Sequence, residues 1–486
     1  MRTRRLTLES LERRDCPTVG YTFLDSLGGV LLAGSVPGNI TVGKIGADIS
    51  INGLDSHVST ANVASFTLTG SGAAASYTIN VNTTQYPALT SATVNGATGF
   101  ANSLKDGDGS AQAWVISSAN GGTVTGGGYS LTFSAMPSIT GGTGGNTFAV
   151  TTGSLSGTLN GGGAVGDTLD YSAYAGSVSV NLATKVATGI HAWTNLQALT
   201  GNGSASTLIG TNAANAWSIT VANSGTVCAF SFFAVANLKG GSNADTFTVS
   251  ASIGSISDLS TNTTIIDTDS SNTTLNLTGI NAGNLPTVGS FGGVQSVTLG
   301  SGTNDVIFAP GALLGGTLNI GTGGELDYSA YGARIYVNLA TPTATGIGTL
   351  AGTAKIVYGP TFGGSTLTGD AAGGDILIAQ GSGNTVAAGG GYNLLVGGSG
   401  GSLAGGTGSD ILIAGTSASL SDLETALAQW AASGGTAQTV LDGTNTHADS
   451  SACTLYQGTG TDWFFIGYRD TLSGFTAGSK ITAEGP

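Results

Sequence analysis

Hydrophobic and polar residues alternate over short stretches along most of the chain. Residues 177–182 (SVSVNL) and 274–280 (TLNLTGI) are typical, and Gly, Asn, Ser and Asp bound such runs. Alternation with a period of two between turn residues is typical of short β-strands with one buried face. The pattern therefore predicts an all-β fold.

One stretch has the periodicity of a helix instead. Ser421 and Glu424 have the spacing of a capping box, and Gly434 lies beyond the last apolar residue. We expect a short helix within residues 416–434. Its apolar face consists of Leu420, Leu423, Leu427 and Trp430, at spacings of three and four.

Internal repeats organise the strands. Residues 167–190 (DTLDYSAYAGSVSVNLATKVATGI) reappear in divergent form as residues 325–347 (ELDYSAYGARIYVNLATPTATGI), and a second pair of similar segments begins at Trp114 and Trp217. Because both Trp residues stand in repeated strand patterns, we expect them to pack in the core rather than to bind sugars. Repeats of this kind predict an elongated parallel β-solenoid, in which each turn buries its apolar residues against its neighbours.

The repeats and the changes in composition divide the chain into seven segments. We expect an N-terminal export or anchoring segment (1–20), a β-rich solenoid region (21–110), repeat unit A (111–210), repeat unit B with an insertion (211–369), a β-roll (370–415), the short helix (416–434) and a capping region (435–486).

Composition excludes several classes of protein. Of 486 residues 83 are Gly, without the three-residue period of collagen, and 8% are charged. A hydrophobic content of 40% argues against intrinsic disorder. A net charge of −14 with 13 Lys and Arg gives no electrostatic footprint for nucleic acid. Since no long uninterrupted apolar run occurs, we expect no transmembrane helix.

Tandem Gly-rich units fill residues 370–413. They read DAAGGDILI, AQGSGNTVA, AGGGYNLLV, GGSGGSLA and GGTGSDILI, and the last fits G-G-x-G-x-D-x-U-x. Glycines tolerate the positive φ of a tight turn, and the sixth residue then points into the concavity of that turn. Carbonyl and carboxylate oxygens gathered there suit Ca²⁺. The sixth positions are occupied by Asp375, Asn384, Asn393, Ser402 and Asp410.

These units resemble the RTX, or haemolysin-type, calcium-binding repeats. The resemblance implies a β-roll whose successive turns alternate sides, so that Asp375, Asn393 and Asp410 stack on one side, and Asn384 and Ser402 on the other. Because the family carries Asp at each place, the substitutions imply weak Ca²⁺ binding. The implied metal ligands are Asp375, Asn393 and Asp410, with Gly405 and Thr407 of the last unit, and Asp245, Asp305 and Asp462 in isolated turns of the same type.

Other interpretations of these side chains stay open. The Asp residues could instead stabilise turns by accepting local backbone N–H groups, and Asn384 and Asn393 could form a side-chain ladder between turns. At the N-terminus, residues 8–14 (LESLERR) resemble part of the LEPR-XLL motif of large bacterial surface proteins.

No catalytic motif stands out. HExxH and the phosphate-binding GxxxxGK[ST] are absent, and the GxSxG match at 397–401 lies within the nonapeptide register. We therefore expect a non-enzymatic, exported protein at the cell surface or outside the cell, structural or adhesive, with weakly bound calcium. Surface polysaccharide or other surface proteins are the expected partners. The alternatives are a carbohydrate-binding or polysaccharide-acting β-helix with a groove along 111–369, and a metal-free solenoid spacer.

Overall fold

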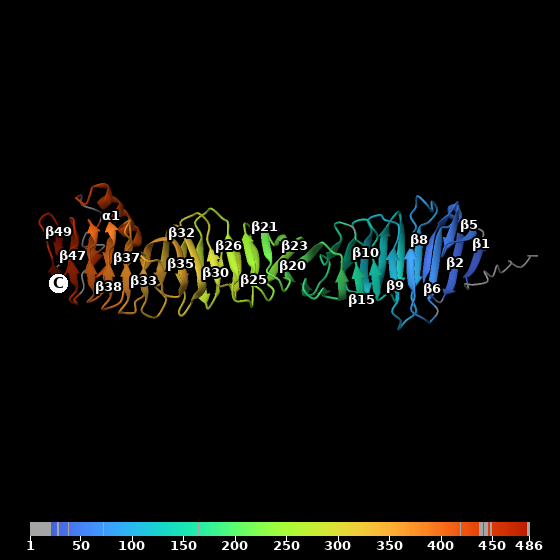
Figure 1. The fold of residues 1–486 in the computed structure, drawn as a ribbon, viewed down its shortest axis with the longest axis horizontal. Helices are drawn as coiled ribbons and strands as arrows, with labels where there is room; N and C mark the ends of the chain where they lie inside the picture. The colour runs from blue at the N-terminus through green and yellow to red at the C-terminus, as the bar shows by residue number, and fades with distance from the viewer. Residues whose placement is uncertain are drawn as a thin grey trace, which may run out of the picture. The chain divides into compact units, whose positions relative to one another are not determined.

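The fold is all-β, as the alternation predicts, with one α-helix in the described part of the chain (Figure 1). The computed structural model describes residues 21–26, 29–36, 38–70, 72–163, 165–417, 419–436, 441, 446–447 and 450–483. Side chains are described from Gly38 onward, apart from that of His57. The expected export or anchoring segment, 1–20, lies outside the described residues.

The chain forms two compact units, and each is described by itself. Unit 1 comprises residues 1–211 and 224–237, and unit 2 comprises residues 212–223 and 238–486. In both units the strands of successive turns pair largely in parallel and in register, which is consistent with the expected β-solenoid.

Inward side chains of unit 1 stack in rows. Ile40 pairs with Tyr77, Tyr77 with Leu104, and Leu104 with Ile139, and all four side chains are buried. Each turn therefore buries its apolar residues against the next turn. The strands of this ladder are β3 (Ile40–Ile45), β7 (Ser76–Ile79), β9 (Ser103–Asp106), β13 (Ser138–Thr140), β15 (Leu155–Asn160) and β19 (Ile190–Thr194). Other ladders of unit 1 contain β6 (Ser65–Gly70), β8 (Ser91–Asn95) and β12 (Tyr129–Ser134), and β10 (Ala113–Ser118), β14 (Thr147–Val150), β16 (Thr168–Asp170) and β20 (Ala198–Ile209).

Antiparallel strands interrupt the parallel ladders, which the repeats do not predict. In unit 1, β11 (Gly121–Gly126) pairs antiparallel with β10 and β12. In unit 2, β28 (Ala282–Leu285) does the same with β27 (Thr274–Gly279) and β29 (Val288–Gly292). Asn120 and Asn281 precede these strands with φ of 54° and 52°. Asn tolerates this left-handed conformation, so it allows the sharp reversal of the chain.

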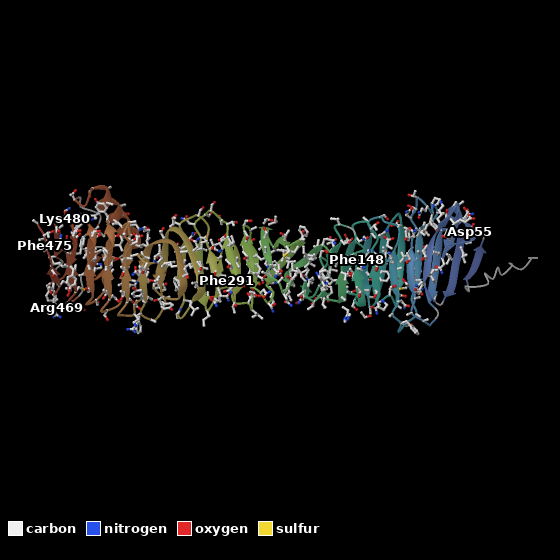
Figure 2. The ribbon with its side chains drawn as sticks, in the orientation of Figure 1. Asp55, Phe148, Phe291, Arg469, Phe475 and Lys480 are labelled. Atoms are coloured by element: carbon white, nitrogen blue, oxygen red, sulfur yellow. The ribbon has the colours of Figure 1, made fainter. Side chains whose placement is uncertain are left out.

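The two Trp residues of the repeats lie in the core, as predicted. Trp114 is 1% exposed and stacks on Phe148, with ring centroids 5.7 Å apart. Trp217 is equally buried and stacks on Phe247 at 5.2 Å. Phe148, which is labelled in Figure 2, therefore belongs to an aromatic pair that recurs in the other unit.

The C-terminal part of unit 2 consists of two ladders between which the chain alternates. After β36 (Thr366–Thr368) the chain crosses to β37 (Ile376–Ile378), returns to β38 (Thr385–Ala387), and continues in this way. One ladder contains β31 (Asp305–Phe308), β32 (Leu314–Asp327), β35 (Ile347–Tyr358), β37, β40 (Leu394–Val396), β43 (Ile411–Ile413), β47 (Trp463–Ile466) and β49 (Lys480–Ala483). The other contains β33 (Tyr336–Asn338), β36, β38, β41 (Ser402–Ala404), β46 (Thr454–Tyr456) and β48 (Thr471–Ser473). Further strands of unit 2 are β21 (Ala216–Val221), β24 (Thr246–Val249), β26 (Thr264–Asp267) and β30 (Ser296–Thr298).

Helix α1 (Leu420–Ala432) covers the outer face of the first of these ladders (Figure 1). Its Trp430 is fully buried and packs on Trp463 of β47. For this reason all three residues of β37, β40 and β43 are buried, whereas in most other strands buried residues alternate with more exposed ones. The expected capping box is wrong in position: Ser419 is the N-cap, and its side chain accepts a hydrogen bond from the N–H of Asp422.

Candidate metal site

Four of the predicted ligands form one continuous row, which we call the Asp/Asn ladder. The backbone N–H of Asp375 donates to Oδ1 of Asn393 at 3.2 Å, that of Asn393 to Oδ1 of Asp410 at 3.0 Å, and that of Asp410 to Oδ1 of Asp462 at 2.8 Å. All four side chains are fully buried. Each residue directly precedes a strand of the ladder under α1, so the regular stacking of turns brings these residues together.

The opposite side of the β-roll carries a shorter row of neutral side chains. Ser365 donates its N–H to Oδ1 of Asn384 at 2.9 Å, and Asn384 Nδ2 donates to the carbonyl of Gly381. The backbone N–H of Ser402 donates to the carbonyl of Asn384 at 2.8 Å. The structure therefore places the two sets of sixth-position residues on opposite sides, as the alternation of turns predicts.

At the start of the Asp/Asn ladder, Asp375 is paired with an ammonium group. Lys355 Nζ lies 3.1 Å from Asp375 Oδ1, 2.7 Å from Asp370 Oδ2 and 2.7 Å from the carbonyl oxygen of Gly373. The other carboxylate oxygen of Asp375 accepts the N–H of Asp370. Burial still raises the pKa of Asp375 above its usual range, while Lys355 opposes that shift. Sequence reasoning missed Lys355, which lies outside the nonapeptide units.

At the other end, two carboxylates face the same glycine. A Cβ atom built on Gly405 would lie 3.4 Å from Asp410 Oδ2 and 3.2 Å from Asp462 Oδ2. Asp410 Oδ2 accepts the N–H of Gly406 at 2.9 Å. Asp462 Oδ2 is buried and makes no hydrogen bond of ordinary geometry with the described residues, although the N–H of Gly458 lowers its pKa.

The electrostatics of this pair favour a cation. Burial raises the pKa of Asp410 to about 6, and the neighbouring charge of Asp462 contributes to the rise. Burial likewise raises the pKa of Asp462. Two buried carboxylates that face one glycine repel each other when both are ionised, and a bound cation or a proton would relieve that repulsion. Gly405, Asp410 and Asp462 therefore form the candidate site.

The other predicted ligand of the last unit, Thr407, lies at a different place in the turn. Its side chain is exposed, its N–H donates to the carbonyl of Gly389 at 2.9 Å, and it forms a bridge with Thr459 of the next turn. These contacts tie adjacent turns together.

At the isolated turn of Asp245 two carboxylates again face one glycine, although here the second one accepts hydrogen bonds from the hydroxyls of Ser260 and Thr263. Asp245 is buried, and its Oδ1 accepts the N–H of Asn215 at 2.7 Å. A Cβ on Gly240 would lie 2.4 Å from Asp245 Oδ2 and 2.5 Å from Oδ2 of Asp258, which is also buried. Sequence reasoning missed Asp258 because its segment, SISDLS, does not fit the nonapeptide pattern.

For Asp305 the expected register is off by one residue. Asn304 is the buried residue of that turn and accepts the N–H of Thr273 through Oδ1 at 3.1 Å. Asp305 is the next residue along, the first of β31, and pairs in register with Glu325 of β32. Its side chain therefore belongs to the outward set rather than to the concavity of the turn. Burial, followed by the charge of Asp305, raises the pKa of Glu325 to about 7.

No three His, Cys, Asp or Glu side chains gather around a common point among the residues that the structure describes. A metal ion at the candidate site would thus need backbone carbonyl oxygens or water beside the two carboxylates. Such mixed oxygen sets suit Ca²⁺, which takes six to eight oxygen ligands in flexible geometry.

Within the described residues, no helix combines the length and the apolar character needed to cross a bilayer.

Comparison with known proteins assigns this chain to no family. No protein-family model and no curated protein sequence matches the chain.

Proposed function

We propose that this chain is an exported structural or adhesive protein of the cell surface or extracellular space, whose Gly-rich turns bind Ca²⁺ weakly. The observation that carries the proposal is the pair of buried carboxylates, Asp410 and Asp462, which both face Gly405. No catalytic machinery enters the proposal.

The strength of binding follows from the number of charges. Asn393 occupies the middle of the Asp/Asn ladder, and Lys355 already neutralises Asp375. Within the Asp/Asn ladder, Asp410 and Asp462 are then the carboxylates that have no cation beside them. Because affinity for Ca²⁺ rises with the number of ligand charges, we expect a dissociation constant of about 10⁻⁴–10⁻³ M, which suits extracellular calcium. Folding of the C-terminal turns would then be completed after export.

Calorimetric Ca²⁺ titration of the chelator-treated protein tests the proposal. We expect binding by the wild-type chain and a smaller heat, with one site fewer, in Asp410→Asn/Asp462→Asn. The matched control is Asp422→Asn, in the first turn of α1, which should bind like the wild type. Equal heats for the double variant and the wild type would refute the site, and the absence of any heat from the wild-type chain would refute weak calcium binding as a whole.

A metal-free spacer is the second candidate, and the contacts of Asn393 and Lys355 favour it. Asn393 Nδ2 donates to Asp410 Oδ1 at 2.9 Å, and Lys355 holds Asp375, so that part of the Asp/Asn ladder is stabilised without metal. If the chelated protein shows the same β-sheet circular dichroism and thermal stability with and without Ca²⁺, the spacer is the better description. The carbohydrate-binding or polysaccharide-acting alternative stays open as well; glycan-array binding or depolymerisation would favour it.

A further inference from the structure

Unit 1 and unit 2 share a turn of the sequence D-x-D-x-S that belongs to none of the Gly-rich nonapeptides. It reads DGDGS at residues 106–110 and DTDSS at residues 267–271. In each copy the N–H of the second Asp donates to Oδ1 of the first at 3.1 Å. The N–H of the Ser donates to Oδ1 of the second Asp at 2.9 Å in both copies. The same local geometry is thus built twice.

The first Asp of each copy occupies a core position. Asp106 ends β9 and continues the inward row in which Val42 pairs with Ile79 and Ile79 with Asp106. Its side chain is 6% exposed. Asp267 likewise ends β26 and pairs in register with the buried Val249 of β24. Its side chain is 2% exposed. A carboxylate at the place of an apolar side chain costs free energy unless it is paired.

In both copies one oxygen of that carboxylate lacks an ordinary partner. Oδ2 of Asp106 and Oδ2 of Asp267 are buried and make no hydrogen bond of normal geometry with any described residue. Near Asp267, the hydroxyl of Thr287 lowers the pKa of the carboxyl, yet burial raises it overall. For Asp106, burial and the nearby charge of Asp108 raise the pKa to about 7, although the N–H of Asp108 and the Gln112 side chain lower it.

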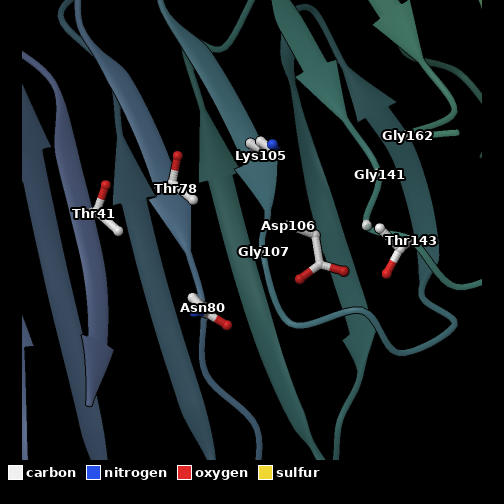
Figure 3. Close-up of a pocket in the computed structure, with 10 residues that line it drawn as sticks. Thr41, Thr78, Asn80, Lys105, Asp106, Gly107, Gly141, Thr143 and Gly162 are labelled. Carbon is white, nitrogen blue, oxygen red and sulfur yellow. The ribbon is translucent and has the colours of Figure 1, made fainter. Parts of the chain in front are cut away.

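The Asp106 copy opens into a small polar pocket, shown in Figure 3. In that view the Asp106 carboxylate lies between Asn80 and Thr143, with one oxygen on the side of Thr143, and the Lys105 side chain lies apart from it. A Cβ on Gly142, in the next turn, would lie 2.6 Å from Asp106 Oδ2. The glycine thus keeps the space beside this oxygen open. The pocket volume is about 230 Å³, below the roughly 300 Å³ of pockets that hold drug-sized molecules.

We propose that the two D-x-D-x-S turns are divalent-cation sites for Ca²⁺, with Asp106 and Asp108 as anionic ligands in unit 1 and Asp267 and Asp269 in unit 2. A hard cation held by oxygen ligands would partner the buried Oδ2 atoms and cancel the repulsion between the paired carboxylates. The Gly-rich backbone of the following turn can supply carbonyl oxygens. These sites are independent of Asp410 and Asp462.

Terbium(III) luminescence, with Tb³⁺ alone as the probe and Ca²⁺ as the competitor, tests the proposal in the Asp410→Asn/Asp462→Asn background. There we expect Ca²⁺-displaceable Tb³⁺ at both turns, and one equivalent fewer after Asp106→Asn/Asp108→Asn or after Asp267→Asn/Asp269→Asn. The matched control is Asp170→Asn/Asp327→Asn, because these residues form the same type of turn with Ser172 and Ser329 at outward positions. Unchanged stoichiometry in either D-x-D-x-S variant, with wild-type circular dichroism, would overturn the site concerned.

Gly142→Ala keeps both carboxylates and fills the space beside Asp106 Oδ2, so it decides the matter if the Asp106→Asn/Asp108→Asn variant does not fold. We expect at least about tenfold weaker Tb³⁺ binding at the unit 1 turn alone, since one oxygen ligand is blocked. Wild-type affinity in a folded Gly142→Ala protein would overturn the assignment of that oxygen as a ligand.

Discussion

Lys355 Nζ lies 3.1 Å from Oδ1 of the fully buried Asp375, so the first carboxylate of the Asp/Asn ladder carries its own counter-ion. The Lys355 side chain is 25% exposed and reaches this position from β35, the strand that precedes β37 in the ladder. At this end of the row the positive charge comes from Lys355, whereas the RTX resemblance implies a calcium ion.

Removal of this ammonium group should leave a buried charge without compensation. For Lys355→Met we expect a loss of about 2–3 kcal/mol in the free energy of unfolding, because breaking a fully buried pair costs about 3–5 kcal/mol and partial exposure reduces that cost. Urea denaturation measures the loss. Lys355→Met/Asp375→Asn should recover part of it, and the exposed Arg334→Met serves as control. A Lys355 variant as stable as the control would mean that the ion pair contributes nothing.

The buried carboxylates should make the metal-free protein more stable in mild acid. Burial raises the pKa of Asp410 to about 6 and of Asp106 to about 7, from 3.8. Between pH 4 and 7 the folded state therefore binds more protons than the unfolded state, and the free energy of unfolding falls as the pH rises. Lowered pKa values at Asp370 and Asp269 oppose this trend.

Thermal melts in chelator across this pH range measure the effect. We expect a higher Tm near pH 5 than near pH 7.5, and a flatter profile for Asp410→Asn, which removes one of the titrating groups. Asp48→Asn, outside the Asp/Asn ladder, should keep the wild-type profile. A Tm that rises steadily from pH 5 to 7.5 would contradict the burial of ionisable carboxylates as the dominant effect.

Helix α1 should be essential to the β-roll because it covers the outer face of four strands. Trp430 is fully buried, packs on Trp463, and donates from Nε1 to the carbonyl of Ser409 at 2.9 Å. We expect Trp430→Ala to cost about 3–5 kcal/mol of unfolding free energy, since a large cavity and a lost hydrogen bond add up. The exposed neighbour Gln429→Ala is the control. Guanidinium denaturation checks both, and equal midpoints would show that the helix is dispensable.

Local pattern predicted much of the fold. The period-two alternation gives the strands, and the nonapeptide spacing places Asp375, Asn393 and Asp410 in one row, because a regular turn length repeats the register. The same spacing gave the wrong register at Asp305, where the six-residue turn begins one residue earlier than expected, at Leu299, and Asn304 takes the buried place. Residue type alone favoured the Asp, although Asn fills this position equally well.

Contacts between distant segments were beyond prediction. Lys355 meets Asp375 across neighbouring turns, and Asp258 meets Asp245 around Gly240, without any shared sequence motif. The helix was predicted from its spacing, but not the sheet face that it covers. In the sequence that face is visible only in the fully apolar triplets of β37, β40 and β43. Such a triplet indicates a strand buried on both faces, but it does not show which element covers the second face.

Placing a carboxylate in the middle of the Asp/Asn ladder should strengthen the proposed calcium binding. Asn393 Nδ2 donates to Oδ1 of Asp410 and to the carbonyl of Gly390, both at 2.9 Å. In Asn393→Asp, the amide group that donates both hydrogen bonds is replaced by a carboxylate oxygen. A further anionic group then lies beside Asp410. We expect a loss of about 1–3 kcal/mol of stability in chelator, because acceptors then face acceptors, and about tenfold tighter Ca²⁺ binding, because the site gains a charge.

Calorimetric titration and melts in chelator measure the two effects of Asn393→Asp, and Asn384→Asp is the matched control. Asn384 has the same place in its turn but stands on the opposite side, next to Ser365 rather than to a carboxylate. Its substitution should therefore not tighten calcium binding. A metal site predicts that Asn393→Asp lowers stability in chelator and raises it in calcium. A structural ladder alone predicts lower stability under both conditions. That result would leave the turns as a metal-free spacer.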